Sequence, residues 1–198
     1  MQMWDRNMPT DDLGHGWAGS MTLPRELHVK DGKLIQKPVS DYYSELEYLY
    51  GSENISVGQK PVAFHKLIKD NTYVHLVVDL SETSNFDIHF AKSKNEGILF
   101  NYDTRTSEFS ISRETIGHKI AGSEVQPLNK RKVKVPLIDN QLVLEIFRDT
   151  SSVEVFINGL ETMTSTFYEI DKGEDIVFVA SETASIGSFE VGRVKISD

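Results

Sequence analysis

The chain has 198 residues, of which 39% are hydrophobic and 26% are charged, a composition typical of a soluble globular protein with one large domain, or one domain and an appendage. Its 21 basic and 30 acidic residues give a net charge of −9, which repels phosphate backbones and argues against nucleic-acid binding. The sequence contains no apolar run near the roughly 18 residues of a membrane span and no cysteine, which excludes disulfides and thiolate chemistry.

Residues 1–39 read as extended chain interrupted by turns. Strands are predicted at Met21–Val29 and Lys33–Val39, joined at Asp31-Gly32, whose residues tolerate positive φ. Upstream, Gly14–Gly19 matches the letters of the dinucleotide motif G-x-G-x-x-G. That motif needs a preceding buried strand and a following helix, and neither fits the prolines on both sides. We interpret the glycines as tight turns around Trp17.

A short linking helix is predicted over Asp41–Tyr50. Ser40 is a suitable N-cap, and Tyr42, Leu46 and Leu49 recur at helical spacing before Gly51.

From Glu53 onward, short apolar or alternating runs are separated by turns rich in Asn, Asp, Gly and Ser. A spacing of roughly 8 to 12 residues is typical of a two-sheet sandwich. The predicted strands are Val62–Ile68, Thr72–Leu80, Asn85–Ala91, Gly97–Tyr102, Glu108–Ser112, Arg131–Leu137, Gln141–Phe147, Ser152–Ile157, Glu161–Tyr168, Asp175–Ala180 and Ser188–Ile196.

The stretch Gln141–Tyr168 organises this pattern. Side chains alternate with a period of two on both sides of Asp149-Thr150-Ser151, which predicts two strands in a tight antiparallel pair. Asn158-Gly159 supplies a second reversal before another strand. Because apolar residues occur on both faces, we expect these strands to be central, with one face against a second sheet and the other partly covered.

Two segments resemble one known family. The run RDTSSVEVFINGLETMTSTFY, residues 148–168, closely resembles the signature of the C-terminal β-sandwich module of glycoside hydrolase family 32, the family of invertases, levanases and sucrose-6-phosphate hydrolases. The run GWAGSMTLPREL, residues 16–27, resembles the segment that closes the catalytic five-bladed propeller of that family. The two runs occur in the family's order and between them span nearly the whole chain.

The resemblance implies hydrolysis of a β-fructofuranoside with retention and without a cofactor. The family's nucleophile, transition-state stabiliser and acid/base lie in the motifs W-M-N-D-P-N-G, R-D-P and E-C, none of which occurs in this sequence. Glu154 is the strongest candidate for a catalytic carboxylate, but its family counterpart belongs to the non-catalytic module. We therefore assign no catalytic residue and expect the chain alone to be inactive.

The resemblance also assigns non-catalytic roles. Trp4 occupies the position of a tryptophan that lines the sugar site of the intact enzyme, with packing inside the propeller as the alternative. Trp17, Leu23, Pro24 and Arg25 are expected to hold the final blade together and to pack it against the sandwich.

Other candidate sites are weaker. His65, His75 and His89 lie on separate predicted strands without a metal-binding spacing, so no metal site is predicted. The basic run Lys130-Arg131-Lys132 lacks the interleaved aromatic residues of a nucleic-acid site and is interpreted as a solvated loop.

The expected fold is an all-β, two-sheet antiparallel sandwich of the concanavalin-like or jelly-roll type, preceded by a β-hairpin arm and a short linking helix. We divide the chain into residues 1–39, the remnant of the last propeller blade, residues 40–52, the helical linker, and residues 53–198, the sandwich. The expected function is that of the non-catalytic C-terminal portion of a β-fructofuranosidase. A stand-alone carbohydrate-binding sandwich and an oligomerisation module stay open as alternatives.

The expected partners are the propeller of the parent enzyme, a second copy of the chain and, in the carbohydrate-binding alternative, a sugar. Without the propeller strands, the arm would have unpaired backbone groups that seek another edge, which favours a homodimer formed by arm exchange over an arm folded back on its own sandwich. Asp5, Arg6, Asp11 and Asp12 interrupt any signal-peptide core. We expect a cytoplasmic protein, or a secreted one if the parent is a levanase or an invertase.

Overall fold

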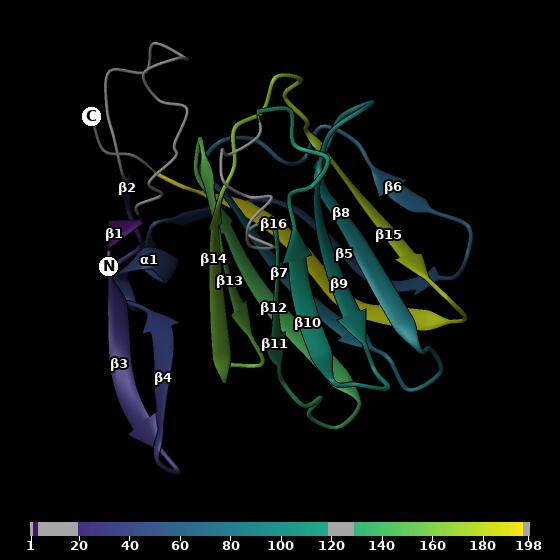
Figure 1. The fold of residues 1–198 in the computed structure, drawn as a ribbon, viewed down its shortest axis with the longest axis horizontal. Helices are drawn as coiled ribbons and strands as arrows, with labels where there is room; N and C mark the ends of the chain where they lie inside the picture. Colours follow the sequence, from purple (N-terminus) through teal and green to yellow (C-terminus); the bar gives the residue numbers. More distant parts are fainter. Residues whose placement is uncertain (1, 4–19, 119–128, 196–198) are drawn as a thin grey trace.

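The computed structural model describes residues 2–3, 20–118 and 129–195. Apart from one short helix, α1, its regular elements are strands (Figure 1). Their bounds are β1 Gln2–Met3, β2 Ser20–Met21, β3 Arg25–Lys30, β4 Lys33–Pro38, α1 Asp41–Ser44, β5 Leu46–Val57, β6 Val62–Phe64, β7 Thr72–Asp79, β8 Asn85–Lys92, β9 Ile98–Asp103, β10 Glu108–Ser112, β11 Lys130–Lys134, β12 Gln141–Arg148, β13 Ser152–Ile157, β14 Glu161–Thr166, β15 Asp175–Ala180 and β16 Ala184–Val194.

Two antiparallel sheets of six strands form the sandwich. Sheet I has the strand order β14-β13-β12-β7-β16-β5, and sheet II has the order β11-β10-β9-β8-β15-β6. Every neighbouring pair within both sheets is antiparallel. The structure thus confirms the predicted fold class, and each strand predicted after residue 53 corresponds to an observed one.

The meander β12-β13-β14 lies where the sequence predicts it. Residues Leu144–Arg148 of β12 pair with Val153–Ile157 of β13, and β13 in turn pairs with β14. Asn158 and Gly159 have φ angles of 52° and 61°, the left-handed conformation that a tight hairpin requires of both turn residues. Strands β12 and β13 each have a neighbour on both sides, and all residues of β13 are buried, so the prediction is confirmed for these two strands. It is wrong for β14, which forms the edge of sheet I.

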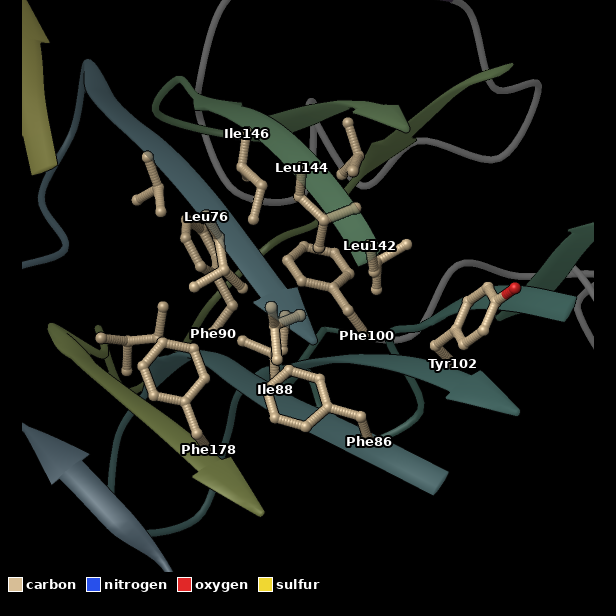
Figure 2. Close-up of a cluster of buried hydrophobic side chains, with 14 of the residues drawn as sticks. Leu76, Phe86, Ile88, Phe90, Phe100, Tyr102, Leu142, Leu144, Ile146 and Phe178 are labelled. Carbon is tan, nitrogen blue, oxygen red and sulfur yellow. The ribbon is translucent and has the colours of Figure 1, made fainter. Parts of the chain in front are cut away.

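The main core fills the space between the two sheets. Figure 2 shows Leu142, Leu144 and Ile146 of β12 on the same side of their strand, facing the side chains of sheet II, many of which are phenylalanines. Phe90, Phe100 and Phe178 are each 0% exposed. Burial of large apolar side chains in this layer is the main source of stability for the fold.

A second, smaller apolar cluster lies on the opposite face of sheet I. It consists of Leu46, Tyr73, Phe147 and Phe156, with Leu23 and Val194 packed against it. Alternation along β12 and β13 accounts for this cluster, because Phe147 and Phe156 point away from the main core while Ile146 and Ile157 point into it. The outer face of sheet I is therefore apolar at the place where the arm reaches it.

The arm, residues 1–39, contains the predicted hairpin. Strands β3 and β4 pair from Arg25 opposite Pro38 to Lys30 opposite Lys33, and Asp31 and Gly32 in the turn have φ angles of 51° and 74°. The hairpin lies beside β14 at one edge of the sandwich (Figure 1). Its outer part exposes Leu27, Val29 and Leu34.

The prediction of a helix over Asp41–Tyr50 is right only for the first turn and wrong for the residues after it. Helix α1 ends at Ser44, and the next residues enter β5, which pairs with β16 from Leu46 opposite Val194 to Val57 opposite Ala184. Tyrosine and leucine at these positions fit a strand as well as a helix, and pairing with β16 decides between them. Sheet I consequently begins with β5 inside residues 40–52, the segment predicted to be a helical linker.

Candidate functional site

The candidate functional site is the interface between the arm and the outer face of sheet I. We call it the arm–sandwich interface: Leu23, Arg25 and Gln36 from the arm meet Glu154, Phe156 and Thr164 from β13 and β14. Trp4 and Trp17, two of the residues singled out from the sequence, lie outside the described part of the chain. Leu23, Pro24 and Arg25 are described, and two of these three contact the sandwich.

Arg25 and Glu154 form the central contact of this interface. The Arg25 guanidinium donates from Nη2 to Oε2 of Glu154, and the two side chains are only 7% and 5% exposed. The other carboxylate oxygen, Oε1, accepts the backbone N–H of Leu23 at 2.7 Å. Glu154 therefore binds both a charge and a backbone group of the arm, as a buried carboxylate must if it is not to destabilise the fold.

Further contacts orient the guanidinium. Nη2 of Arg25 also donates to the Thr164 hydroxyl at 2.8 Å, and Nη1 donates to Oε1 of Gln36 at 2.8 Å. The guanidinium carbon lies 5.4 Å from the centre of the Phe156 ring, within the range of a cation–π contact. Arg25 is thus held from the hairpin side by Gln36 and from the sandwich side by β13 and β14.

Aromatic rings fill the space next to the ion pair. Phe147 packs against Tyr73, with ring centres 4.9 Å apart, and against Phe156, at 5.9 Å. Tyr42 of α1 approaches the Phe147 ring edge-on at 6.2 Å. These rings connect α1, β7, β12 and β13 into one apolar surface below the arm.

A cluster of tyrosines surrounds Glu145, farther along the same face. The hydroxyls of Tyr43 and Tyr73 donate to Oε1 of Glu145 at 2.8 and 3.2 Å. Burial is the main cause that raises the pKa of both phenols, and the Glu145 charge raises the pKa of each further. Both hydroxyls therefore stay protonated donors, and they tie α1 to β7 and β12.

A cavity of about 440 Å³ opens beside the Arg25–Glu154 pair. It is lined by arm residues 21–24, by Tyr42 of α1 and by the ends of β7, β12, β13 and β16 that lie nearest the arm. Glu154 and Asp149 are the carboxylates in its lining, and within the described ranges no group of three or more His, Cys, Asp or Glu side chains could hold a metal ion.

The buried Glu154 carboxylate contacts the arm and is only 5% exposed. A retaining glycosidase needs two carboxyl groups about 5 Å apart on either side of the scissile bond, both open to the sugar. Both carboxylate oxygens of Glu154 are occupied by the arm instead. The sequence singles out Glu154 but not Arg25 as its partner. The sequence feature that could have indicated a partner is the position of Glu154 between Val153 and Val155 on a strand. A charged residue buried among apolar neighbours needs a partner.

No helix in the described residues is long and apolar enough to cross a membrane.

Comparisons with known proteins agree with this architecture. Residues 45–195 match the family model described as "Glycosyl hydrolases family 32 C terminal". The chain is 28% identical over 188 residues to a sucrose-6-phosphate hydrolase of Escherichia coli, covering 94% of this chain and 36% of that protein. It is 33% identical over 172 residues to a raffinose invertase of Escherichia coli, covering 85% of this chain and 33% of that protein.

A solved structure shows the same fold. The fructan 1-exohydrolase IIa of Cichorium intybus superposes with a TM-score of 0.80 at 15% sequence identity, covering all of this chain and 45% of the enzyme. This chain spans about a third of the length of the two bacterial relatives. On the strength of the family match over residues 45–195, the chain belongs to the C-terminal module of glycosyl hydrolase family 32.

Proposed function

We propose that this chain is the non-catalytic C-terminal portion of a β-fructofuranosidase that hydrolyses sucrose or sucrose 6-phosphate, and that its sandwich holds the last part of the catalytic domain in place. The observation that carries this proposal is the engagement of Glu154 by Arg25 and by the Leu23 N–H. These two residues belong to the segment that resembles the end of the propeller, and Glu154 belongs to the sandwich.

The role assigned to Glu154 is mechanical. A buried ion pair that also carries a backbone hydrogen bond fixes both the position and the direction of the incoming chain. The carboxylate has no free oxygen to attack a sugar or to donate a proton. In this proposal, Leu23 and Arg25 connect the two domains of the complete enzyme, and Pro24 fixes the backbone between them.

The proposed substrates come from the relatives. Two proteins that share 28% and 33% of their aligned residues with this chain are named a sucrose-6-phosphate hydrolase and a raffinose invertase. Since the chain corresponds to about a third of each, the residues that would select and cleave the substrate belong to the rest of such an enzyme.

The proposal is tested by two assays in parallel. The purified chain is incubated with sucrose, sucrose 6-phosphate and levan, and we expect no turnover above that of a mock preparation, because each missing catalytic group would have to supply several kcal/mol of barrier lowering. In the second assay, the chain replaces the matching C-terminal third of the Escherichia coli sucrose-6-phosphate hydrolase, and we expect the chimera to cleave sucrose 6-phosphate.

A Glu154→Ala chimera provides the matched variant. It should lose thermal stability and activity together. The substitution leaves the catalytic residues of the chimera unchanged, but it removes the contacts of Glu154 that hold the end of the catalytic domain against the sandwich. Hydrolysis by the isolated chain would refute the non-catalytic role. A well-folded chimera whose activity and melting temperature are indifferent to Glu154→Ala would refute the supporting role of the interface.

A further inference from the structure

A second cavity lies beside the loop that joins β6 to β7, and no residue of the arm lines it. We call it the loop cavity. Five residues of the segment 66–72 form one wall, and Leu49 of β5 with Val191 and Arg193 of β16 forms the other. Its volume is about 220 Å³, below the roughly 300 to 1,000 Å³ of pockets for drug-sized ligands. A space of this size suits a small anion, or a single sugar ring that carries one.

The charged side chains of the lining leave an excess of positive charge. Lys66, Lys69 and Arg193 are positive and Asp70 is negative, which gives the loop cavity a net charge of +2. The whole chain, in contrast, has a net charge of −9. A local excess of positive charge on an acidic protein attracts anions that the rest of the surface repels.

The arginine and the aspartate in this lining are already paired. Nη2 of Arg193 lies 2.7 Å from the Glu47 carboxylate, and Nζ of Lys172 lies 2.5 Å from Oδ2 of Asp70. The ammonium groups of the two lining lysines form no ion pair or hydrogen bond within the described ranges of the chain. Both lysine side chains are exposed, so their charges are open to a ligand.

Hydrogen bonds hold the loop that carries these lysines. Asp175 of β15 accepts the backbone N–H of Lys66 at 3.0 Å and pairs with Nδ1 of His65 at 2.8 Å. The Lys66 charge acts on Asp175 at longer range, but both oxygens of this carboxylate are already bound. Lys66 has a φ angle of 59°, a left-handed conformation that is uncommon for a residue with a side chain.

The second lysine is fixed in a similar way. The backbone N–H of Lys69 donates to the Thr72 hydroxyl at 2.7 Å, and this hydroxyl donates to the Lys69 carbonyl at 2.6 Å. Between the two lysines, the Ile68 N–H donates to the Glu174 carbonyl at 2.8 Å. Because the backbone is held at each of these points, a ligand need not order the loop, which lowers the entropic cost of binding.

Charge and size favour a phosphoryl group as the ligand. A phosphate monoester carries about −1.5 to −2 charges at pH 7 and has three strong acceptor oxygens, which matches two unpaired ammonium groups. Lysine binds phosphate as a compact charge with three donors. The exposed Leu49 and the half-buried Leu67 add apolar surface to the lining, against which the C–H groups of a small sugar can pack.

We propose that the loop cavity binds a phosphoryl group through Lys66 and Lys69, either as free phosphate or as the phosphate of a small sugar. The site belongs to the sandwich, and binding there makes and breaks no covalent bond. The proposal does not rest on the proposed function, because the chain would bind in the same way whether or not it forms part of a hydrolase.

The test is an NMR titration of the complete, isotopically labelled 198-residue chain with inorganic phosphate, fructose 6-phosphate and fructose at constant ionic strength. We expect saturable shifts in the millimolar range with both phosphates, centred on the amides of residues 65–72, and none with fructose. In a separate series, affinity should fall as sodium chloride is added. Tighter binding of fructose 6-phosphate than of phosphate would identify a sugar phosphate as the ligand, whereas equal or weaker binding would identify the phosphoryl group alone.

Two outcomes of this titration would overturn the proposal. One is the absence of saturation with either phosphate at up to about 50 mM. The other is a set of shifts centred on the basic strand β11 instead of residues 65–72, because that would place the anion on Lys130–Lys134.

Matched variants locate the binding. Lys66→Gln and Lys69→Gln each remove one ammonium group and should weaken phosphate binding about three- to fivefold, and the double variant should weaken it at least about tenfold. Lys30→Gln and Lys94→Gln are the controls, because both lysines are exposed and neither lines the loop cavity. They change the total charge equally and should bind as the parent does. Equal weakening in the controls would mean that only the overall charge matters, and would contradict the assigned site.

Melting temperatures guard against misfolding. Since Lys66 and Lys69 are exposed, all variants should melt close to the parent without ligand. Fructose 6-phosphate should raise the melting temperature of the parent more than that of the double variant, because a ligand that binds only the folded chain stabilises it. An equal rise in the two proteins would contradict the proposal.

Discussion

Arg25 of β3 and Glu154 of β13 are paired in the interior, although 129 residues separate them in the sequence. The two side chains are 7% and 5% exposed, so water screens the pair little. Such a pair adds limited net stability but becomes costly when one member is removed, because the other is left buried and uncompensated. This pair is the central one of the contacts that couple the arm to the sandwich.

Removing either member of this pair should destabilise the chain strongly. We expect Arg25→Ala and Glu154→Ala each to lower the free energy of unfolding by about 3 to 5 kcal/mol, measured by urea denaturation. The matched control is Arg105→Ala, which breaks a surface pair with Asp103 in which the arginine is 70% exposed and should cost less than about 1 kcal/mol. Equal losses in the buried and surface variants would mean that the interface opens in solution.

The neighbouring residues Phe156 and Ile157 report on the two faces of β13. Phe156 is 2% exposed below the arm, and Ile157 is 0% exposed between the sheets. We expect Phe156→Ala to cost about 3 to 5 kcal/mol and Ile157→Ala about 2 to 5 kcal/mol. Ile170→Ala serves as the control, since this isoleucine is 67% exposed. If both core variants melted within a few degrees of the parent, the central position of β13 would be wrong.

Glu182 should make stability depend on pH in the acid range. Hydrogen bonds from the Ser181 hydroxyl and the Ser84 N–H, at 2.5 and 2.6 Å, lower its pKa from 4.5 to about 2. A lowered folded-state pKa means that the contribution of Glu182 is fully present above pH 4.5 and is lost as the pH falls towards 2. Glu182→Gln should therefore be less stable than the parent at pH 7, and the two should converge near pH 2.

Ser181→Ala tests the cause of that shift. Without the strongest donor, the pKa of Glu182 should rise, and acid unfolding should begin at a higher pH than in the parent. Denaturation midpoints measured at several values between pH 7 and pH 2 distinguish the three proteins. A constant difference between parent and Glu182→Gln across this range would show that the Glu182 charge does not contribute to stability.

The homodimer expected from the sequence stays a prediction. In the single chain the described part of the arm contacts its own sandwich through Arg25 and Glu154, and arm exchange would place the same contact between two chains. We expect light scattering to give about twice the monomer mass, and deletion of residues 1–39 to return the chain to a monomer. A monomer at high protein concentration would favour the folded-back arm.

The alternation of side chains was enough to predict the sandwich, because a half-buried strand imposes a period of two on its own residues. Turn chemistry fixed the hairpins in the same local way: Asp31-Gly32 and Asn158-Gly159 adopt the positive φ angles that their residue types favour. The segment 46–50 was misassigned because its tyrosines and leucines are compatible with two periodicities, and pairing with β16 was not visible in the local sequence.

The candidate site was less predictable for a related reason. A charged residue between two valines needs a buried partner, but the sequence does not say which one, because Arg25 is one of 21 basic residues and lies on another element far away in the chain. The cavity depends on residues from the arm, α1 and four strands, so no single stretch of sequence carries its pattern. Tertiary structure brings these residues together.

The pairing of Leu46 with Val194 has a practical meaning for protein engineering. The chain enters and leaves the sandwich on adjacent strands, where the Lys195 N–H donates to the Glu45 carbonyl at 2.9 Å. Entry and exit points about 5 Å apart are what a host loop needs to accept an inserted domain without being stretched. We therefore expect that residues 45–195 can be inserted into a surface turn of an unrelated protein, or that residues 45 and 195 can be joined and new termini opened at an exposed turn.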